Sequence, residues 1–227
     1  MLLAACASRP VSLPSDNEIS QSFRRPTPSS LIVLLPAQVE TADLEPGAAV
    51  LMTALHRRLT AAGYKVIALD EGSYDAIWSQ EVAEVGGIYD PHTGVLRRHE
   101  LMLALGRLVQ RVSLETHAAM VMRPQLVLRR AEISGMSATW DGQQRRVPVF
   151  GLGADTITND GSTLGLSVGL DVFTPSGELV MHTYGGILLP YRINVLSSKN
   201  EVRSDLFANG TEVIDGVGIA LKPFFNI

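Results

Sequence analysis

The chain has 227 residues, the length of one large domain or of two small ones. Apolar residues make up 46% and charged residues 19% of it, so the chain can bury a sizeable core and is not wholly disordered. A net charge of −4 argues against a nucleic-acid-binding protein, because such domains are usually basic. The single cysteine excludes an internal disulfide framework and a cysteine-built zinc site. No stretch reaches the ~18 consecutive apolar residues of a membrane helix.

The first six residues carry the sharpest local motif. Leu3, Ala4, Ala5 and Cys6 match the bacterial lipobox, which is an apolar residue, two small residues and a cysteine. The order follows from the chemistry, because the signal peptidase must fit small side chains before the scissile bond and the cysteine thiol must accept a diacylglycerol. Residues 1–6 are therefore predicted to be the remnant of a lipoprotein signal peptide, with Cys6 as the lipidation site. Two acyl chains on the cysteine and a third, such as palmitate, on the new amine would anchor the protein firmly, since one chain alone is marginal.

A complete secretory signal also needs a charged region and ~7–15 apolar residues before the cleavage site. Only residues 1–5 precede Cys6, and none of them is basic. We therefore expect the true start to lie upstream of Met1; the alternative is a chance match in a cytosolic protein with a free cysteine. Ala7, rather than aspartate, follows the cysteine, which resembles the sorting of enterobacterial lipoproteins to the outer membrane.

Residues 7–30 are predicted to be a flexible tether. Prolines interrupt the segment repeatedly and serine is frequent in it. Proline removes backbone donors and blocks regular structure, so the segment is not expected to fold as a helix or strand. A lipoprotein needs such a spacer between its anchor and its domain, although an ordinary disordered N-terminus would have the same composition.

The remaining residues, 31–227, are predicted to form one domain. Residues 31–35 are a short apolar run that predicts a buried strand. Apolar residues at helical spacing predict a helix over 47–62, and residues 65–69 predict a second strand. A strand, a helix and a strand within so short a stretch form a βαβ unit, whose crossover makes the two strands parallel.

Beyond this unit the pattern changes from helical to alternating. Residues 75–84 and 96–114 predict helices, and the second has apolar positions recurring at i, i+4, i+7 and i+11. From Ala118 the period is two, so residues 119–133 predict a strand or a strand pair, with Pro124 disturbing the pairing at an edge or bulge.

The second half of the domain is predicted to be mostly antiparallel. An Asp-Gly dipeptide marks a hairpin turn within residues 137–149, and residues 151–162 are predicted to be a polar loop. Residues 163–173 alternate cleanly, and residues 178–184 return as their hairpin partner. A C-terminal helix is expected over 200–221, with a break near its glycines. The predicted fold class is α/β, a single domain with a mixed parallel and antiparallel sheet and packed helices.

Four short motifs resemble a known superfamily. They are the first strand ending in proline (LIVLLPA, 31–37), the Gly-Tyr junction before KVIAL, the strand entry at 118–121 and the hairpin LDVFTPSGELV at 170–180. In these motifs and in its order of elements, the chain resembles the periplasmic lipoprotein superfamily that includes the curli-export channel lipoprotein and the lipoprotein activators of penicillin-binding proteins. Their shared domain is similar to the N-terminal domain of the Tol-system translocation protein.

The resemblance implies an outer-membrane lipoprotein on the periplasmic side, held in the membrane through its lipid anchor. The superfamily is largely non-catalytic and works by binding other envelope proteins, so the expected partner is an envelope protein and the expected process is envelope assembly. The resemblance therefore implies no enzyme activity and no cofactor. The sequence leaves open whether the protein forms a homo-oligomer.

Hydrolysis, in the cytosol or in the envelope, is the alternative function. Residues 165–169 read Gly-x-Ser-x-Gly, and Ser167, Asp171 and His182 follow one another in a chain order known from catalytic triads. That motif requires a sharp strand-to-helix turn that exposes the serine, whereas here it lies within an alternating strand. Ser167 is therefore expected to face away from the core without a catalytic role, and hydrolysis is the less favoured hypothesis.

Two groups of side chains resemble metal sites without completing one. Asp90, His92 and His99 lie near one turn, but two histidines at this spacing need a further ligand from elsewhere. The acidic loop at 155–160 misses the alternating spacing of a calcium loop. Surface histidines and solvated turns are the commoner case, so no metal site is predicted.

Trp140 is the candidate aromatic anchor for a contact with a partner. It lies beside the predicted hairpin turn with Arg145 and Arg146 nearby, and tryptophan and arginine are frequent at the energetic centres of interfaces. The alternative is that Trp140 packs over the edge of the sheet. Arginine far outnumbers lysine and occurs in doublets; such a face could bind anionic headgroups, although solvated arginines are the ordinary case.

Overall fold

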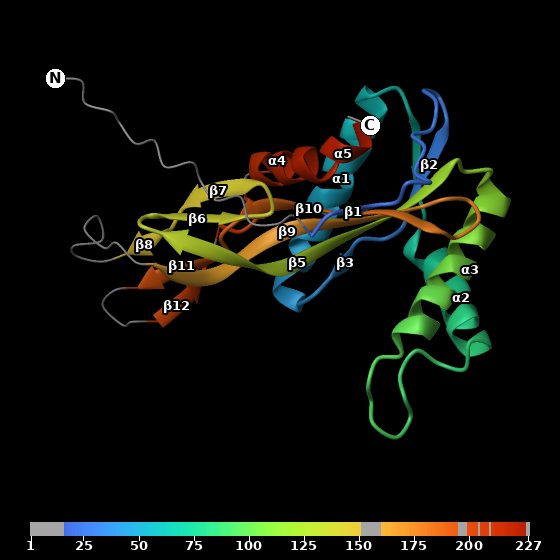
Figure 1. The fold of residues 1–227 in the computed structure, drawn as a ribbon, viewed down its shortest axis with the longest axis horizontal. Coiled ribbons are helices and arrows are strands. Elements are labelled where there is room, and N and C mark those ends of the chain that lie inside the picture. The colour runs from blue at the N-terminus through green and yellow to red at the C-terminus, as the bar shows by residue number, and fades with distance from the viewer. Residues whose placement is uncertain (1–15, 151–159, 195–198, 204, 209, 226–227) are drawn as a thin grey trace.

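The computed structural model describes residues 16–150, 160–194, 199–203, 205–208 and 210–225. In chain order the elements are β1 (Glu18–Ile19), β2 (Leu31–Leu34), β3 (Gln38–Val39), the 3-10 helix η1 (Ala42–Leu44), α1 (Glu45–Ala61), β4 (Lys65–Ala68), α2 (Glu71–Glu84), α3 (Arg98–Thr116), β5 (Met120–Ser134), β6 (Ser137–Trp140), β7 (Gln143–Arg146), β8 (Val149–Phe150), β9 (Gly161–Phe173), β10 (Leu179–Leu188), β11 (Tyr191–Asn194), β12 (Lys199–Val202), α4 (Thr211–Ala220) and α5 (Lys222–Phe225). They form one α/β domain in which helices pack on a mixed nine-stranded sheet, so the predicted fold class is confirmed (Figure 1).

The predicted βαβ unit is present at the start of the domain. β2 and β4 are parallel, with Leu31 opposite Lys65, and α1 is the crossover between them. β5 lies parallel to β2 on its other side, so β2 is a central strand and β4 is an edge. This position explains why β2 reads as a continuous apolar run, because a strand covered on both faces has no polar side.

The centre of the sheet is a long antiparallel pair, β5 and β9. Their register runs without a break from Val121 opposite Phe173 to Ile133 opposite Gly161. Pro124 lies opposite Leu170 within this register, so the predicted strand is one strand and not a pair. β9 pairs in turn with β10, as the hairpin motif predicted.

Separate groups of helices cover the two faces of the sheet. Leu166, Val168 and Leu170 of β9 face the core cluster that contains the buried residues of α1 and α4. On the opposite face, Phe173 joins Val121 in a second cluster with the buried side chains of α2 and α3. The alternation along β9 produces this division, because successive side chains point to opposite faces. Figure 1 shows α1 and α4 above the sheet and the α2–α3 pair extending away below it.

The β6–β7 hairpin curls over one end of the sheet and reaches β10. The predicted turn is present, and its two residues, Asp141 and Gly142, both have positive φ. The amide of Gly186 in β10 donates to the Asp141 carbonyl at 3.0 Å, and Gln143 Nε2 donates to the Gly186 carbonyl at 3.4 Å. A third, smaller core cluster around Trp140 fills the space under the hairpin.

The N-terminal part of the described chain belongs to the domain. β1 pairs with β10 and so forms one edge of the sheet, and Phe23 is only 3% exposed because its ring packs against Phe224 at 5.7 Å between centroids. The structure therefore differs from the expected tether over residues 16–30. The reason is a long-range contact between the two ends of the chain, which composition does not reveal. The rest of the expected tether, residues 7–15, lies outside the described residues.

The expected C-terminal helix over 200–221 is corrected in its first half. β12 ends at Val202 and pairs with β11, and the side chain of Val202 is 49% exposed. The helix α4 begins only at Thr211, where Val213 and Val217 face the core as predicted. Pairing with β11 overrides the local helical spacing, since a strand partner can decide a weak propensity. Most of the predicted polar loop at 151–162 lies outside the described residues.

Candidate functional site

Trp140 is a buried residue and not a surface anchor. It is 2% exposed, and its indole Nε1 donates to the carbonyl of Leu166 at 3.2 Å. Gly165 and Gly186 make room for its ring, because a Cβ on either would lie within 3.0 Å of indole atoms. The expectation of an exposed aromatic contact is thus corrected, and the alternative, packing over the sheet, describes the structure. A buried indole N–H usually has a hydrogen-bond acceptor, and here the Leu166 carbonyl supplies it.

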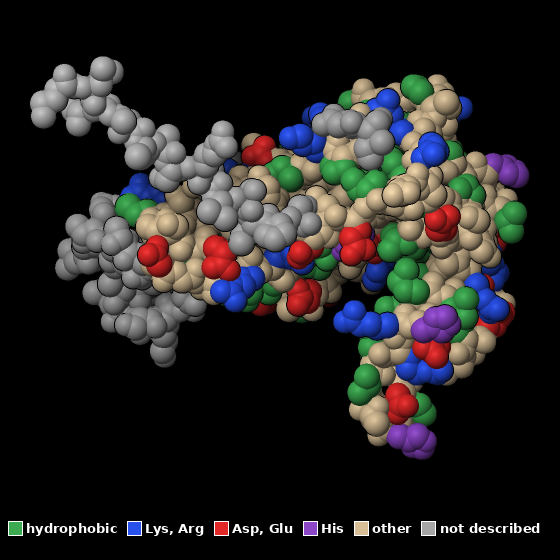
Figure 2. Space-filling model, in the orientation of Figure 1, with side chains coloured by type: hydrophobic (Ala, Val, Ile, Leu, Met, Phe, Trp, Pro, Cys, Tyr) green, Lys and Arg blue, Asp and Glu red, His purple; other side chains and the backbone are tan. Residues whose placement is uncertain are grey.

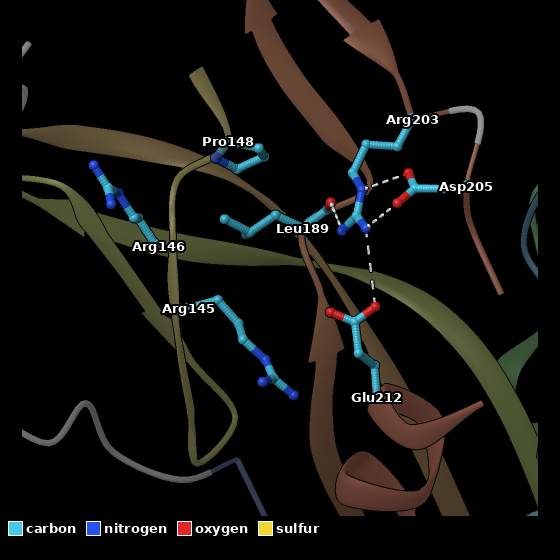
Figure 3. Close-up of a pocket in the computed structure, with 7 residues that line it drawn as sticks. All are labelled: Arg145, Arg146, Pro148, Leu189, Arg203, Asp205 and Glu212. Atoms are coloured by element: carbon cyan, nitrogen blue, oxygen red, sulfur yellow. Dashed lines mark hydrogen bonds and ion pairs between the residues drawn. The ribbon is translucent and has the colours of Figure 1, made fainter. Parts of the chain in front are cut away.

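Arg145 and Arg146, the other two residues of the predicted patch, line a pocket of about 410 Å³. Arg145 and Arg146 are the last two residues of β7, and Pro148 follows shortly after them in the chain. Figure 3 shows the pocket between this hairpin strand, Leu189 after β10, and the segment that carries Arg203. The remaining lining residues are Asp205 and Glu212.

The pocket walls carry paired charges of both signs. Arg203 donates to both oxygens of Asp205, at 3.0 and 2.8 Å, and lies 4.0 Å from a carboxylate oxygen of Glu212. The hydrogen bond with Asp205 raises the pKa of Arg203, against the smaller opposing effect of burial. Arg145 donates to Asp215 of α4 at 3.0 Å. The pocket therefore combines charged groups of both signs with apolar side chains, and the fold positions the guanidinium groups of Arg145 and Arg203.

Arg145 and Arg146 are neighbours in β7, but their side chains have different environments. Arg145 is about one-third exposed in its side chain, and its Nε also donates to the carbonyl of Ile187 at 3.4 Å. Arg146, the next residue, is exposed at the rim. Because neighbours in a strand point to opposite sides, one arginine ties the hairpin to α4 and β10 while the other is presented outward. Contact of Arg146 with a partner stays a prediction.

The structure does not bring Ser167 and His182 together. Ser167 is fully buried, and its Oγ donates to a carboxylate oxygen of Asp141 at 2.6 Å. His182 Nδ1 contacts the carboxylate of Asp171 instead. In the β9–β10 register Ser167 is opposite Gly186, four residues from His182, which separates the two positions by about 13 Å. A nucleophile and its base must be within hydrogen-bond reach, so this arrangement does not form the catalytic pair of the alternative hypothesis.

The sequence did not predict a polar network on the face of the sheet that carries Ser167 and Asp171. Arg129 donates to both oxygens of Asp141, at 3.0 and 3.3 Å, and to Asp16 at 2.5 Å. Its guanidinium carbon lies 3.8 Å from the ring centroid of Tyr184, a cation–π contact. Burial opposes the charge of Arg129, but its hydrogen bonds with Asp141 and Asp16 raise its pKa overall. Burial also raises the pKa of Tyr184.

A second part of the network surrounds Asp171. Its carboxylate accepts from Gln125 Nε2 at 2.9 Å and from Arg123 at 3.2 Å, besides the contact with His182. The alternation of polar and apolar residues in β5 and β9 could have indicated a polar face. Which of these residues pair depends on the strand register, and the sequence does not give that register.

The turn that contains Asp90 is one of the two places where the sequence resembles a metal site without completing one. Asp90 Oδ1 accepts hydrogen bonds from the amides of His92 and Thr93 and from the Thr93 hydroxyl. These bonds, those from Thr93 first, lower the pKa of Asp90, and they make the carboxylate part of a local turn. Among the residues that the structure describes, no group of three or more His, Cys, Asp or Glu side chains is placed to hold a metal ion. The acidic loop at 155–160 falls largely outside the described residues.

Cys6, the predicted lipidation site, also lies outside the described residues. Across the described parts of the chain, no helix has the length and apolar character needed to cross a membrane.

No protein-family model matches the sequence, and no curated protein matches it. The structure is similar to a PelC dodecamer from Paraburkholderia phytofirmans, at 9% identity and a TM-score of 0.44, over 93% of this chain and 96% of that chain. It is also similar to the lipoprotein GNA1162 from Neisseria meningitidis, at 10% identity and a TM-score of 0.34, over 79% and 90% of the two chains. A hypothetical protein, CT253 from Chlamydia trachomatis, matches at 14% identity and a TM-score of 0.35, over 86% and 91%. Similarity at this level does not transfer a function.

Proposed function

We propose that this protein is a non-catalytic bacterial outer-membrane lipoprotein, acylated at Cys6 and facing the periplasm, whose domain binds another envelope protein. The observation that carries the proposal is the lipobox match at residues 3–6. Acyl chains on Cys6 would hold the domain at the membrane surface. The remaining support comes from how the N-terminal segment joins the domain.

The chain that leads from Cys6 enters the domain through bonds to the central strands. Asp16 forms an ion pair with Arg129 at 2.5 Å, and Asn17 Oδ1 accepts from the amide of Tyr184 at 2.8 Å. β1 and the buried ring of Phe23 follow directly. An anchor attached here would pull on β1 and, through Asp16 and Asn17, on β5 and β10. This attachment suits a domain that is held in place by its N-terminus.

The pocket beside the β6–β7 hairpin is the proposed contact for a protein partner. It combines guanidinium and carboxylate groups with the apolar side chains of Leu189 and Pro148. Interfaces favour arginine next to apolar groups, and a charged wall selects a partner with the complementary pattern. Binding of this kind needs no catalytic group.

Metabolic labelling tests the anchor. The protein is expressed from its native locus, with the upstream sequence, beside a Cys6→Ala variant, and both are exposed to radiolabelled palmitate. The proposal predicts label in the membrane fraction that disappears in the variant. An unlabelled protein in the cytosol would leave only the fold and favour the cytosolic alternative.

Site-specific photocrosslinking in intact cells tests the partner contact. A photoreactive residue replaces Arg146, and a matched control replaces Arg107, an arginine of α3 that forms an ion pair with Glu84 far from the pocket. We expect a discrete protein adduct at position 146 and not at position 107. Equal adducts at both positions, or none at 146, would remove the pocket from the proposal.

A further inference from the structure

The α2–α3 pair forms an arm that is packed against the sheet only near its base. The buried residues of α3 begin at Ala104, and those of α2 end at Glu81. The ends of both helices and the loop between them, residues 85–97, therefore extend beyond the core cluster. Figure 1 shows this loop at the far end of the arm, away from the strands.

The tip of the arm exposes large apolar side chains. Tyr89 is 58% exposed, Val95 63% and Leu96 38%. Met102 and Leu103, in the first turns of α3, are exposed as well. In Figure 2 the lower end of the arm shows apolar side chains beside histidine and charged groups. We call Tyr89, Val95, Leu96 and the neighbouring Arg98 the arm tip.

Local bonds fix the shape of the arm tip. Tyr89 and Leu96 form a β-bridge, and the amide of Gly94 donates to the carbonyl of Asp90 at 2.9 Å. Arg97 donates to the carbonyls of Gly86 and Gly87, both at 3.1 Å. The apolar groups are thus presented by an ordered loop, and ordering them on a ligand costs little further entropy.

The tip carries one guanidinium, that of Arg98, without a carboxylate partner in the described chain. The carboxylate of Asp90 accepts three bonds within its own turn, and Glu100 is paired with Arg97 at 2.5 Å. Arg98 is exposed and makes no hydrogen bond or ion pair within the described chain. An unpaired guanidinium beside tyrosine and aliphatic groups matches the interface of a bilayer, where phosphates lie next to acyl chains.

The chain length between Cys6 and the domain brings one bilayer within reach of the arm. Nine residues, 7–15, separate Cys6 from Asp16, and fully extended they span about 30 Å. The 14 residues of α2 and the 19 of α3 span about 21 and 28 Å. Arg129, which holds Asp16, pairs in register with Gly165 and so shares the sheet face on which the arm packs. The extended length of the spacer and the length of the arm are therefore similar, and Asp16, the first described residue after the spacer, is bound on the face where the arm packs.

We propose that the arm tip binds the surface of the bilayer that carries the lipid anchor, with Tyr89, Val95 and Leu96 in the interfacial region and Arg98 on lipid phosphates. This inference rests on the proposed lipidation of Cys6. Anchor and arm together give two points of attachment, which fix the orientation of the domain on the membrane. The tip binds the bilayer on its own, and the anchor strengthens that binding because it raises the effective concentration of the tip at the lipid surface.

Vesicle flotation of the non-acylated full-length chain tests the inference separately from the anchor. The Cys6→Ser protein is mixed with vesicles of phosphatidylethanolamine and phosphatidylglycerol, or of phosphatidylcholine alone. We expect binding to the anionic vesicles, and a decrease of about tenfold in the partition coefficient for Val95→Asp, because one charge replaces an inserted aliphatic group. Arg98→Glu should weaken binding to anionic vesicles more than to neutral ones.

Leu114→Asp is the matched control, since Leu114 is 77% exposed on α3 outside the arm tip. It should leave vesicle binding unchanged, and circular dichroism should show all variants folded. The inference would be overturned if the Cys6→Ser protein without further substitutions floated with neither kind of vesicle. It would also be overturned if Leu114→Asp lost as much vesicle binding as Val95→Asp. A change of oligomeric state in Val95→Asp with unchanged flotation would assign the tip to a protein contact instead. Because no acyl chain is present, none of these outcomes depends on the palmitate result.

Discussion

Asp141, in the turn of the β6–β7 hairpin, accepts a 2.6 Å hydrogen bond from the hydroxyl of Ser167 in the middle of β9. Arg129 of β5 binds the same carboxylate through two nitrogens. The turn is therefore fastened to two neighbouring strands of the sheet by one side chain. This bond explains how a hairpin that carries Arg145 and Arg146 is held in a fixed position, and why Ser167 is a structural residue.

Removing either side of this bond should destabilise the domain by different amounts. We expect Ser167→Ala to lower the free energy of unfolding by about 1–2 kcal/mol, because Asp141 keeps Arg129 as a partner. Asp141→Ala should cost about 3 kcal/mol, since it leaves the buried Ser167 hydroxyl without its acceptor and removes two of the hydrogen bonds of Arg129, which keeps Asp16. Urea denaturation measures both losses of stability, provided that the m-value is the same in the wild type and the variants. Ser79→Ala, at an exposed position of α2, is the control, and an effect of Ser79→Ala as large as that of Ser167→Ala would contradict the prediction.

The close packing of Trp140 against glycine predicts a position-specific cost. A Cβ at Gly165 would lie 2.5 Å from the indole, whereas one at Gly161, in the same strand, would meet nothing within 4 Å. Gly165→Ala should therefore lower the thermal midpoint, with a loss of about 1–3 kcal/mol from overpacking. Gly161→Ala should be close to neutral. Equal stability of the two variants would mean that Trp140 is not packed as described.

The N-terminus of α2 predicts a dependence of stability on pH. Asp70 accepts a hydrogen bond from the amide of Ser73 at 2.9 Å, and its bonds with the side chain and amide of Ser73 lower its pKa. A carboxylate whose pKa is lower in the folded than in the unfolded protein stabilises the folded state at pH values above the unfolded-state pKa. That contribution is lost as the pH falls below about 4. The stability difference between wild type and Asp70→Asn should thus be largest near neutral pH and shrink in acid. Asp75→Asn, at an exposed position of the same helix, should show no such convergence.

The geometry of Ser167 predicts how the protein responds to probes for serine hydrolases. Its hydroxyl is buried and donates to Asp141, not to a histidine. A fluorophosphonate probe should therefore leave the folded protein unlabelled, both in wild type and in Ser167→Ala. Stoichiometric labelling that Ser167→Ala abolishes would revive the hydrolase hypothesis.

The sequence predicted those parts of the fold whose signals are local. The alternation in β9 predicted a strand that packs apolar side chains mainly on one face. The apolar run of β2 predicted a strand that is covered on both faces. The start of α2 came four residues earlier than its apolar spacing indicated. Asp70 caps it there, so a polar residue and not the apolar pattern sets the boundary.

The parts that the sequence did not predict depend on distant contacts. Phe23 is buried against Phe224, Val202 follows a strand partner, and Trp140 lies over glycines from two other strands. The same reason limits the candidate site. Arg145 and Arg146 could be found from their place after a turn, but Arg203 and Glu212 reach the pocket only through the fold.

The mass of the N-terminal peptide of the membrane-purified protein tests the central claim most directly. The protein is expressed with its native upstream sequence, extracted from the outer membrane and digested, and its first peptide is identified by mass spectrometry. A peptide that begins at Cys6 and carries a diacylglycerol thioether with an acylated amine is the predicted result. A peptide that contains Cys6 as a free thiol within a longer unmodified chain, from protein recovered in the cytosol, would contradict it.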